Sequence, residues 1–454
     1  MLIGKGASPS GSRPDRLVGE AGPTAPGRRI RSLDVLRGFA LLGILMLNIE
    51  SFSGPATMHD VPVGTGHPVF VGWHATLDLV ILLVKWVFFE GKMRTLFSML
   101  YGAGIVLLAE RLEQHGGTGA AADVFCRRNM WLLLFGVLHG TLIWQGDILS
   151  QYALVALLFM FPFRRVAAGR LVALGLIVGV LGGTFGVIRM TGAPAVLAAE
   201  DLREGGRAAL RAHLAPSADQ RAALVEDAAE RSAMPGRIEA AIRGGRAPYL
   251  RSIGPRTEGY LGFVEGLFRS GWILEVIGSM LLGMGLFKSG FLTGAWSSRS
   301  YAVAAAAGYL VSAPIVILGV SMAIGQGFTS ASITRWMFVP YEAEVFAGAF
   351  ANAALLLLIV RAGRGGRVAN ALANGGRTAF SNYILTSVLC QLVFAWGPWK
   401  LFGSLEYYEQ LYVVAAVWAM NLVASALWLP WFLYGPLEWG WRALVYWRWQ
   451  PILR

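Results

Sequence analysis

Ten apolar segments long enough to cross a membrane run through this chain, and they constrain what it can fold into. They cover residues 34–53, 94–110, 129–145, 149–163, 170–191, 262–287, 300–324, 341–361, 378–397 and 409–434. Segments of this length are typical of helices that span the hydrocarbon core. With 55% hydrophobic and only 15% charged residues, the chain is not an ordinary soluble enzyme. The sequence therefore predicts an all-α, polytopic integral membrane helical bundle of about ten to eleven transmembrane helices.

A further apolar stretch, residues 74–90, differs from these because it carries His74, Asp78, Lys85 and Glu90. It is either an interfacial or re-entrant segment or a true eleventh span. Treating it as interfacial keeps the arginine-rich tail, loops and C-terminus on one side of the membrane. On that map the chain is a multi-pass protein of the cell inner membrane with both termini in the cytoplasm. An eleventh span would invert the later loops, and this alternative stays open.

Four regions follow one another along the chain. Residues 1–28 are rich in Gly, Pro, Ser and Arg, which predicts a disordered basic tail. Residues 29–191 form an N-terminal transmembrane domain, and residues 261–454 form a C-terminal one. Between them, residues 192–260 are hydrophilic and indicate an extramembrane helical loop. Its short helices are expected to break at Pro216 and Pro235. This loop is either a solvated cap or a lid over a substrate cavity.

The net charge of +12 does not indicate a nucleic-acid partner, because the Arg and Lys residues lie mostly between the apolar segments and there set membrane orientation. Membrane lipids are the expected partners. Three histidines and two aspartates near the second apolar stretch match no zinc spacing, so we expect no metal site. They are His59, His67, His74, Asp60 and Asp78.

Asp34 and Arg37 stand one helical turn apart where the first apolar segment begins. Ionisable groups at the edge of hydrocarbon are costly and usually find partners or line a polar cavity. The pair is therefore either part of a functional site or a topogenic anchor, with the arginine extending to the headgroups and the aspartate capping the helix.

His139 lies near the middle of a spanning segment, and its imidazole suits proton transfer near neutral pH. It is a candidate general base or a hydrogen-bonded packing residue. Gly136 and Gly140 flank it at the spacing that lets another helix approach closely. Asp147, in the short turn that follows, is expected to orient the imidazole, to cap the next helix, or both.

Basic residues also stand at the start of two other apolar segments. Lys92 and Arg94 beside a helix N-terminus suit the phosphate or carboxylate of a substrate or of a lipid headgroup. Arg377 precedes a polar cluster at the entry of a later span. The closing segment, residues 435–442, is typical of an amphipathic interfacial helix.

Together these motifs resemble the YeiB-like family of bacterial inner-membrane proteins. The resemblance is carried by Leu33-Asp34-Val35-Leu36-Arg37-Gly38 with Asn48, the glycine-containing helix 96–104, Leu138-His139-Gly140, Gly146-Asp147-Ile148-Leu149, Gly376-Arg377 with Asn382-Tyr383, and Gly435-Pro436-Leu437-Glu438-Trp439. The last two motifs resemble the family's C-terminal domain of unknown function 418.

That family is distantly similar to transmembrane acyltransferases, which move an acyl group from cytoplasmic acyl-CoA to a sugar across the membrane. The shared element is the first-span signature matched by Asp34, Leu36, Arg37 and Gly38. Acyltransferase-3 proteins carry a histidine eleven residues after this arginine, where this chain has Asn48. The departure shifts the expected base to His139.

The resemblance thus implies an O- or N-acyltransferase with acyl-CoA as co-substrate, no bound cofactor, and a glycan or other cell-envelope acceptor. His139 would be the base, and Asp147 or Asp34 would orient or balance the imidazolium. The substrate-binding set is Arg37, Asn48, Lys92, Arg94 and Arg377.

The alternative is a proton-coupled transporter or a lipid-handling permease that uses Asp34, Arg37, His139 and Asp147 as a proton relay. The acyltransferase hypothesis requires these four residues to face one cavity. Homo-oligomerisation stays open in either case.

Overall fold

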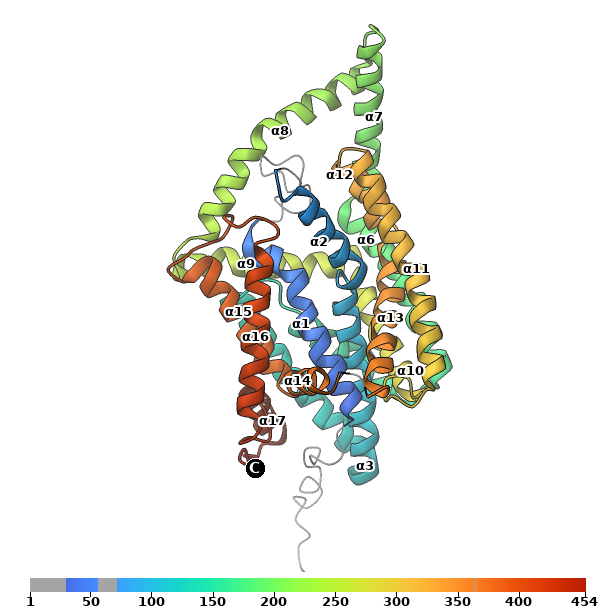
Figure 1. Ribbon diagram of the computed structural model, residues 1–454, viewed down its shortest axis with the longest axis vertical. Coiled ribbons are helices and arrows are strands. Elements are labelled where there is room, and N and C mark those ends of the chain that lie inside the picture. The colour runs from blue at the N-terminus through green and yellow to red at the C-terminus, as the bar shows by residue number, and fades with distance from the viewer. Residues whose placement is uncertain (1–29, 56–71, 364) are drawn as a thin grey trace, which may run out of the picture.

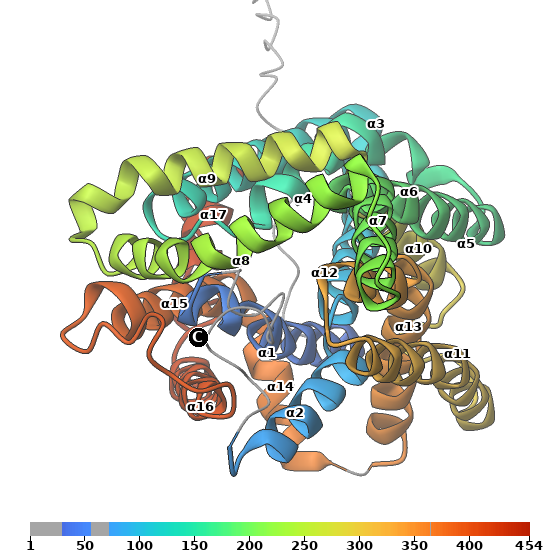
Figure 2. The ribbon, with the colours of Figure 1, turned by 90° about the horizontal axis from the view of Figure 1, so that it is seen from above.

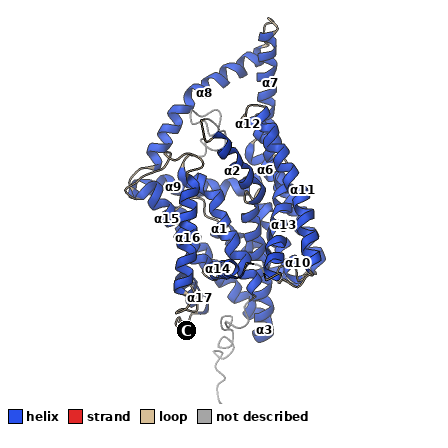
Figure 3. Ribbon diagram, viewed as in Figure 1, coloured by secondary structure: helices blue, strands red, loops and turns tan. Residues whose placement is uncertain are grey.

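The computed structural model describes residues 30–55, 72–363 and 365–454, and these residues form helices with no strands (Figure 3). One isolated antiparallel bridge joins Phe432 to Leu453. The expected tail of residues 1–28, together with His59, Asp60 and His67, lies outside the described residues. The predicted all-α membrane architecture is confirmed for the described part of the chain.

The α-helices are α1 Arg31–Ser53, α2 Ala75–Phe88, α3 Lys92–Leu142, α4 Leu149–Val155, α5 Ala168–Leu176, α6 Gly183–Thr191, α7 Ala193–Arg211, α8 Ala218–Gly245, α9 Tyr249–Ser270, α10 Ile273–Lys288, α11 Ser298–Gly325, α12 Ser330–Ile333, α13 Tyr341–Arg361, α14 Gly366–Arg377, α15 Ala379–Gln391, α16 Gln410–Trp428 and α17 Pro436–Tyr446. Four π-helical turns, Ala156–Met160, Ile177–Gly182, Thr334–Phe338 and Leu392–Trp396, and one 3₁₀ turn, Phe161–Arg165, extend these helices.

Among the described residues, seven helical stretches are long and apolar enough to cross a membrane, or eight if the bent pair α9 and α10 counts as one span. The sequence-based count of ten to eleven also included residues 129–145 and 149–163, which do not reach this length and hydropathy as single helices. The stretch that was left open, residues 74–90, joins the start of α3 in one candidate span, Ala75–Gln114.

Helix α1 runs through the middle of the bundle (Figure 1). It contacts α14 at backbone distance, because a Cβ atom on Gly38 would lie only 1.9 Å from the carbonyl oxygen of Leu372. The contact is reciprocal, since a Cβ atom on Gly376 would lie 1.9 Å from the carbonyl oxygen of Asp34. Two motif glycines therefore let the first span pack directly against α14, within the C-terminal region.

Helix α3 turns back on itself at Gly117, whose φ of 75° and ψ of 178° interrupt the helix. A positive φ is accessible to glycine at little cost. The second half of α3, which carries His139, therefore packs beside α4, where a Cβ atom on Gly136 would lie 2.3 Å from the Ser150 backbone nitrogen.

Helices α7 and α8 form an arch that projects from one end of the bundle, and α9 crosses that end beside α3 and α4 (Figures 1 and 2). A capping box between Ser217 and Gln220 starts α8. The predicted break at Pro235 is wrong, because this proline lies inside the 28-residue α8. The arch ends on the loop before α16, where the Arg246 side chain donates to the carbonyl oxygen of Phe402 at 2.8 Å.

Charge pairs hold α7 against α8. Arg207 bonds Glu200 on its own helix and Asp227 on α8, each at 3.1 Å, and Arg231 bonds Asp227 at 3.1 Å. Burial alone would raise the pKa of Asp227, but Arg231, Arg203 and Arg207 together hold it below the ordinary value of 3.8. The ionised carboxylate therefore stabilises the α7–α8 pairing.

A depressed pKa stabilises the folded arch above the unfolded-state pKa of about 3.9, and this contribution disappears as the pH falls through the folded-state value. We expect the protection of α7 and α8 against hydrogen–deuterium exchange, relative to the intrinsic exchange rate at each pH, to fall below about pH 4 in the wild type. Asp227→Asn should raise exchange already at pH 7 and remove the pH dependence. Glu239→Gln, which loses only the exposed pair with Arg243, is the control. Equal exchange in both variants at pH 7 would contradict the assignment.

Candidate functional site

A buried hydrogen-bonded array joins His139, Asp147 and Ser387. The imidazole Nδ1 lies 3.0 Å from Asp147 Oδ1, and Nε2 lies 2.9 Å from Ser387 Oγ. The three residues are 1%, 0% and 2% exposed. When Asp147 is ionised and the imidazole is neutral, Nδ1 donates to the carboxylate and Nε2 is left to accept from the serine hydroxyl. This order of acid, imidazole and hydroxyl is the arrangement that activates a hydroxyl or relays its proton.

The local backbone fixes Asp147 in this array. Its Oδ2 atom accepts from the Ser150 backbone N–H at 2.7 Å, while its carbonyl oxygen accepts from the Gln151 side chain at 2.8 Å. Asp147 thus makes both contacts that the sequence offered, with the ring of His139 and with the first turn of α4. Gly136 provides the room, since a Cβ atom there would lie 2.7 Å from Asp147 Oδ2.

Ser387 is the member of the array that the sequence did not single out. It lies in the apolar helix α15, 248 residues from His139 along the chain. A serine in such a helix ordinarily bonds the carbonyl one turn earlier, and Ser387 Oγ also lies 3.3 Å from the Tyr383 carbonyl oxygen. Its role is therefore invisible without the packing of α15 against α3.

A cavity of about 440 Å³, here called the arginine-lined cavity, opens among the first turns of α1, the middle of α3, α15 and α17. Five arginines line it, together with the acids Asp34, Glu110 and Glu438; the arginines are Arg37, Arg111, Arg128, Arg377 and Arg442. Arg37 pairs with Asp34 at 3.2 Å.

Glu438, from the closing motif, caps helix α15 at the wall of this cavity. Its carboxylate accepts from the backbone N–H groups of Phe380 and Ser381 at 2.7 and 3.2 Å and from the Ser381 hydroxyl. A helix N-terminus favours a negative charge in this position. Burial nonetheless raises the pKa of Glu438 above its ordinary value of 4.5, against the effect of these hydrogen bonds.

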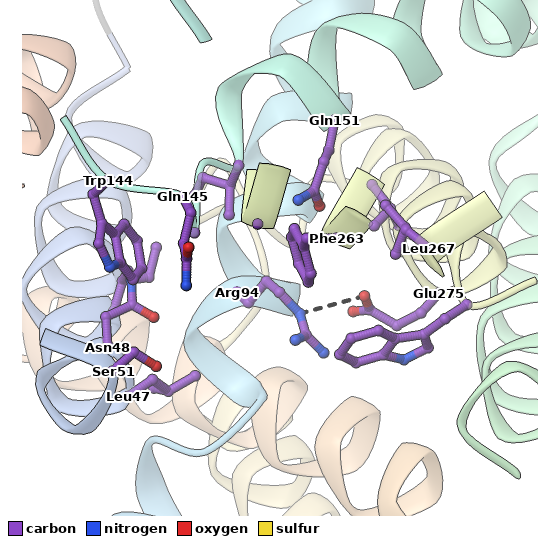
Figure 4. A pocket seen from close by; sticks show the side chains of 16 residues that line it. Leu47, Asn48, Ser51, Arg94, Trp144, Gln145, Gln151, Phe263, Leu267 and Glu275 are labelled. Carbon is purple, nitrogen blue, oxygen red and sulfur yellow. Dashed lines mark ion pairs between the residues drawn. The ribbon is translucent and has the colours of Figure 1, made fainter. Parts of the chain in front are cut away.

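A second cavity of about 270 Å³, here called the amide-lined cavity, lies among α1, α4, α9 and α10 (Figure 4). Its polar wall consists of Asn48, Ser51, Arg94, Gln145, Gln151 and Glu275, and its aromatic wall consists of Trp144, Phe263 and Trp272. Arg94 pairs with Glu275 at 3.4 Å and stacks over Trp272 at 4.5 Å. Its Nη2 atom has no hydrogen-bond partner among the described residues.

The array lies between the two cavities. Ile148 lines the amide-lined cavity, whereas the next residue, Leu149, lines the arginine-lined one. The ring of His139 is 5.0 Å from Tyr383, which faces the arginine-lined cavity, and 6.4 Å from Trp144, which faces the amide-lined one. His139, Asp147 and Ser387 line neither cavity.

The structure thus separates residues that the sequence analysis grouped together. Asp34, Arg37 and Arg377 line the arginine-lined cavity, and Asn48 and Arg94 line the amide-lined one. Asp34 and Asn48 are 14 residues apart on α1, which corresponds to about 21 Å along the helix axis. The expected single cavity that Asp34 and Arg37 share with His139 and Asp147 is therefore not the observed arrangement.

Lys92, expected to bind substrate, lines neither cavity. It is 0% exposed and forms an ion pair with Glu344 of α13. Its ammonium group also donates to the Trp86 carbonyl oxygen at 2.7 Å. These contacts pair the lysine with groups of the protein itself. Arg94 lines the amide-lined cavity, whereas Lys92 lines neither of the two cavities.

Comparison with known proteins matches residues 286–448 to the family described as "Protein of unknown function (DUF418)". Over most of its length the chain is homologous to bacterial proteins. The uncharacterized protein YxaH of Bacillus subtilis is 29% identical over 95% of this chain and 98% of the relative. The uncharacterized protein YeiB of Escherichia coli is 28% identical over 91% of this chain and 95% of the relative. An uncharacterized 39.9 kDa protein in the amylase 3' region of Bacillus acidopullulyticus is 27% identical over 95% of this chain and 98% of the relative. No solved structure matches the chain. The resemblance to the YeiB-like family, which the motifs indicated, is confirmed.

The fit of Asp147 against α3 depends on Gly136, because a Cβ atom there would also lie 2.3 Å from the Ser150 backbone nitrogen. We expect Gly136→Ala to destabilise the protein by about 1–3 kcal/mol, the usual cost of overpacking, and to lower its melting temperature in detergent. Gly119→Ala on the same helix meets no atom within 4 Å and is the matched control, expected to melt at or above the wild-type temperature. Equal melting of the two variants would contradict the close fit.

Proposed function

We propose that this homologue of YeiB, whose C-terminal region belongs to the DUF418 family, is a membrane acyltransferase. In this proposal it moves an acyl group from cytoplasmic acyl-CoA to a hydroxyl or amine of a carbohydrate or other cell-envelope acceptor. The proposal no longer requires Asp34 and Arg37 to share a cavity with His139 and Asp147. The observation that carries it is the Asp147–His139–Ser387 array, buried between an arginine-lined and an amide-lined cavity.

The arginine-lined cavity is the proposed donor site. Coenzyme A carries several phosphates, and guanidinium groups bind phosphate through paired, charge-assisted hydrogen bonds. Five arginines against three acids give this cavity a positive balance. It opens beside the start of α1, the helix that follows the basic residues 1–28 in the sequence, and the positive-inside rule assigns this end of the helix to the cytoplasm, where acyl-CoA is found.

The amide-lined cavity is the proposed acceptor site. Side-chain amides offer both donors and acceptors to the hydroxyl groups of a sugar, and aromatic rings offer an apolar face to its ring. Asn48, Gln145 and Gln151 supply the amides, while Trp144 and Phe263 supply aromatic faces. At about 270 Å³ the cavity suits one small ring rather than a polymer.

The array would manage the proton of the acceptor. As the acceptor oxygen or nitrogen attacks the thioester carbonyl, its proton passes through the Ser387 hydroxyl to Nε2 of His139. Asp147 stabilises the resulting imidazolium. The proton then returns to the sulfur as the carbon–sulfur bond breaks, which yields the acylated acceptor and free coenzyme A. Both substrates reach the array when the rings of Tyr383 and Trp144 move aside.

The test uses purified full-length protein in nanodiscs with labelled acetyl-CoA and a panel of glycan acceptors. We expect acceptor-dependent release of coenzyme A, and we expect His139→Ala to lower the rate by about 10²-fold or more, the usual share of general acid–base catalysis. Ser387→Ala should lower it as well, while His213→Ala, at an exposed position between α7 and α8, should not. The melting temperature of each variant verifies folding.

Two results would contradict this proposal. One is acceptor-dependent release of coenzyme A that persists in folded His139→Ala protein. The other is accumulation of a substrate inside proteoliposomes without turnover of coenzyme A, which would favour the transporter alternative.

A further inference from the structure

Glu342 and Glu344, at the start of α13, point into the bundle although helix α13 is a candidate membrane span. The residues are 0% and 1% exposed. Glu342 Oε1 accepts from the indole N–H of Trp272 at 2.9 Å, and Glu344 Oε2 pairs with Lys92 and accepts from Ser312 at 3.3 Å. The other oxygen of each carboxyl group, Glu342 Oε2 and Glu344 Oε1, has no hydrogen-bond partner among the described residues.

Charged groups face these carboxyl groups from several elements. Helix α3 contributes Lys92 and Arg94, helix α10 contributes Glu275, and the turn before α3 contributes Glu90. Tyr341 on α13 donates to Glu90 Oε1 at 3.1 Å. Helix α11 contributes the neutral Ser312, and α6 contributes the backbone at Gly183.

The charges of this cluster do not balance. Three of these carboxyl groups are fully buried, and two of the three pair with a cation, Glu344 with Lys92 and Glu275 with Arg94. An unpaired charge buried in an apolar bundle costs far more than a neutral polar group without a partner. Glu342 forms no ion pair among the described residues, so its carboxyl group is expected to be neutralised by a bound cation or by a proton.

A metal ion does not fit the cluster. Ca²⁺ and Mg²⁺ take about six or more oxygen ligands, and no group of acidic, histidine or cysteine side chains among the described residues is arranged to hold a metal. A proton needs no such shell. Glu342 Oε2, which has no hydrogen-bond partner among the described residues, is the atom on which the proton would lie.

We propose that Glu342 is a proton-binding site that keeps its proton at neutral pH, while Glu344 stays ionised against Lys92. The site communicates with the amide-lined cavity, because Glu275 and Arg94, which face Glu342, also line that cavity. Helix α13 thereby carries a titratable group that is separate from the Asp147–His139–Ser387 array. The inference is independent of acyl transfer, since it depends on charge balance alone.

Infrared spectroscopy of the purified protein in lipid tests the site directly, because a protonated carboxyl group absorbs apart from a carboxylate. At pH 7 we expect the wild type to show a protonated-carboxyl band, and we expect Glu342→Gln to reduce it. Glu113→Gln removes an acid that pairs with Arg164 and Arg165 outside the cluster and should leave the band unchanged. A band that is absent, or that Glu342→Gln does not reduce, would overturn the proposal.

A charge-balance series covers the case in which a single variant folds poorly. Lys92→Met leaves one more uncompensated carboxylate and should lower the melting temperature, while the double variant Lys92→Met with Glu344→Gln should recover most of the loss. A double variant no more stable than Lys92→Met would count against the charge argument. Melting of the wild type is also compared in sodium, potassium and choline chloride, and stabilisation by sodium alone would assign the site to a metal cation instead of protons.

Discussion

The backbone contact between α1 and α14 joins the N-terminal and the C-terminal transmembrane regions. Gly38 and Gly376 face each other across it, and any side chain at either position would collide with the opposite backbone. Because the contact fixes the first turns of α1 beside the end of α14, Asp34, Arg37 and Arg377 all reach the same cavity. The glycines of two separate sequence motifs thus have one physical reason, and the arginine-lined cavity depends on it.

Local patterns determined most of what could be predicted. Long apolar segments predicted the helices, and the short turn after α3 predicted that Asp147 lies near His139, since eight residues cannot carry the chain far. Ser387 could not be found in this way, because its partner lies 248 residues away and a serine is unremarkable in an apolar helix. Contacts between distant segments leave no periodic signal in a single sequence.

Lys92 also shows that a local pattern does not reveal a partner that is distant in the sequence. A lysine next to a helix N-terminus suits an anion, and an anion does bind it, but the anion is Glu344 of the same chain, 252 residues away. The prediction of a cluster of four functional residues in one cavity was wrong for a related reason. Asp34 and Arg37 line the arginine-lined cavity, whereas the packing of α3, α4 and α15 buries His139 and Asp147 so that they line neither cavity.

The two buried polar systems differ in their charge balance, and this difference separates their chemistry. In the array, one imidazole meets one carboxylate at 3.0 Å, so an imidazolium formed during a reaction has its counter-ion in place. A general base needs this compensation only while it holds the proton of the substrate. Glu342, by contrast, forms no ion pair among the described residues and is proposed to hold its proton at rest. A group that already holds its proton cannot act as a base, which leaves His139, and not Glu342, to accept a proton from a substrate.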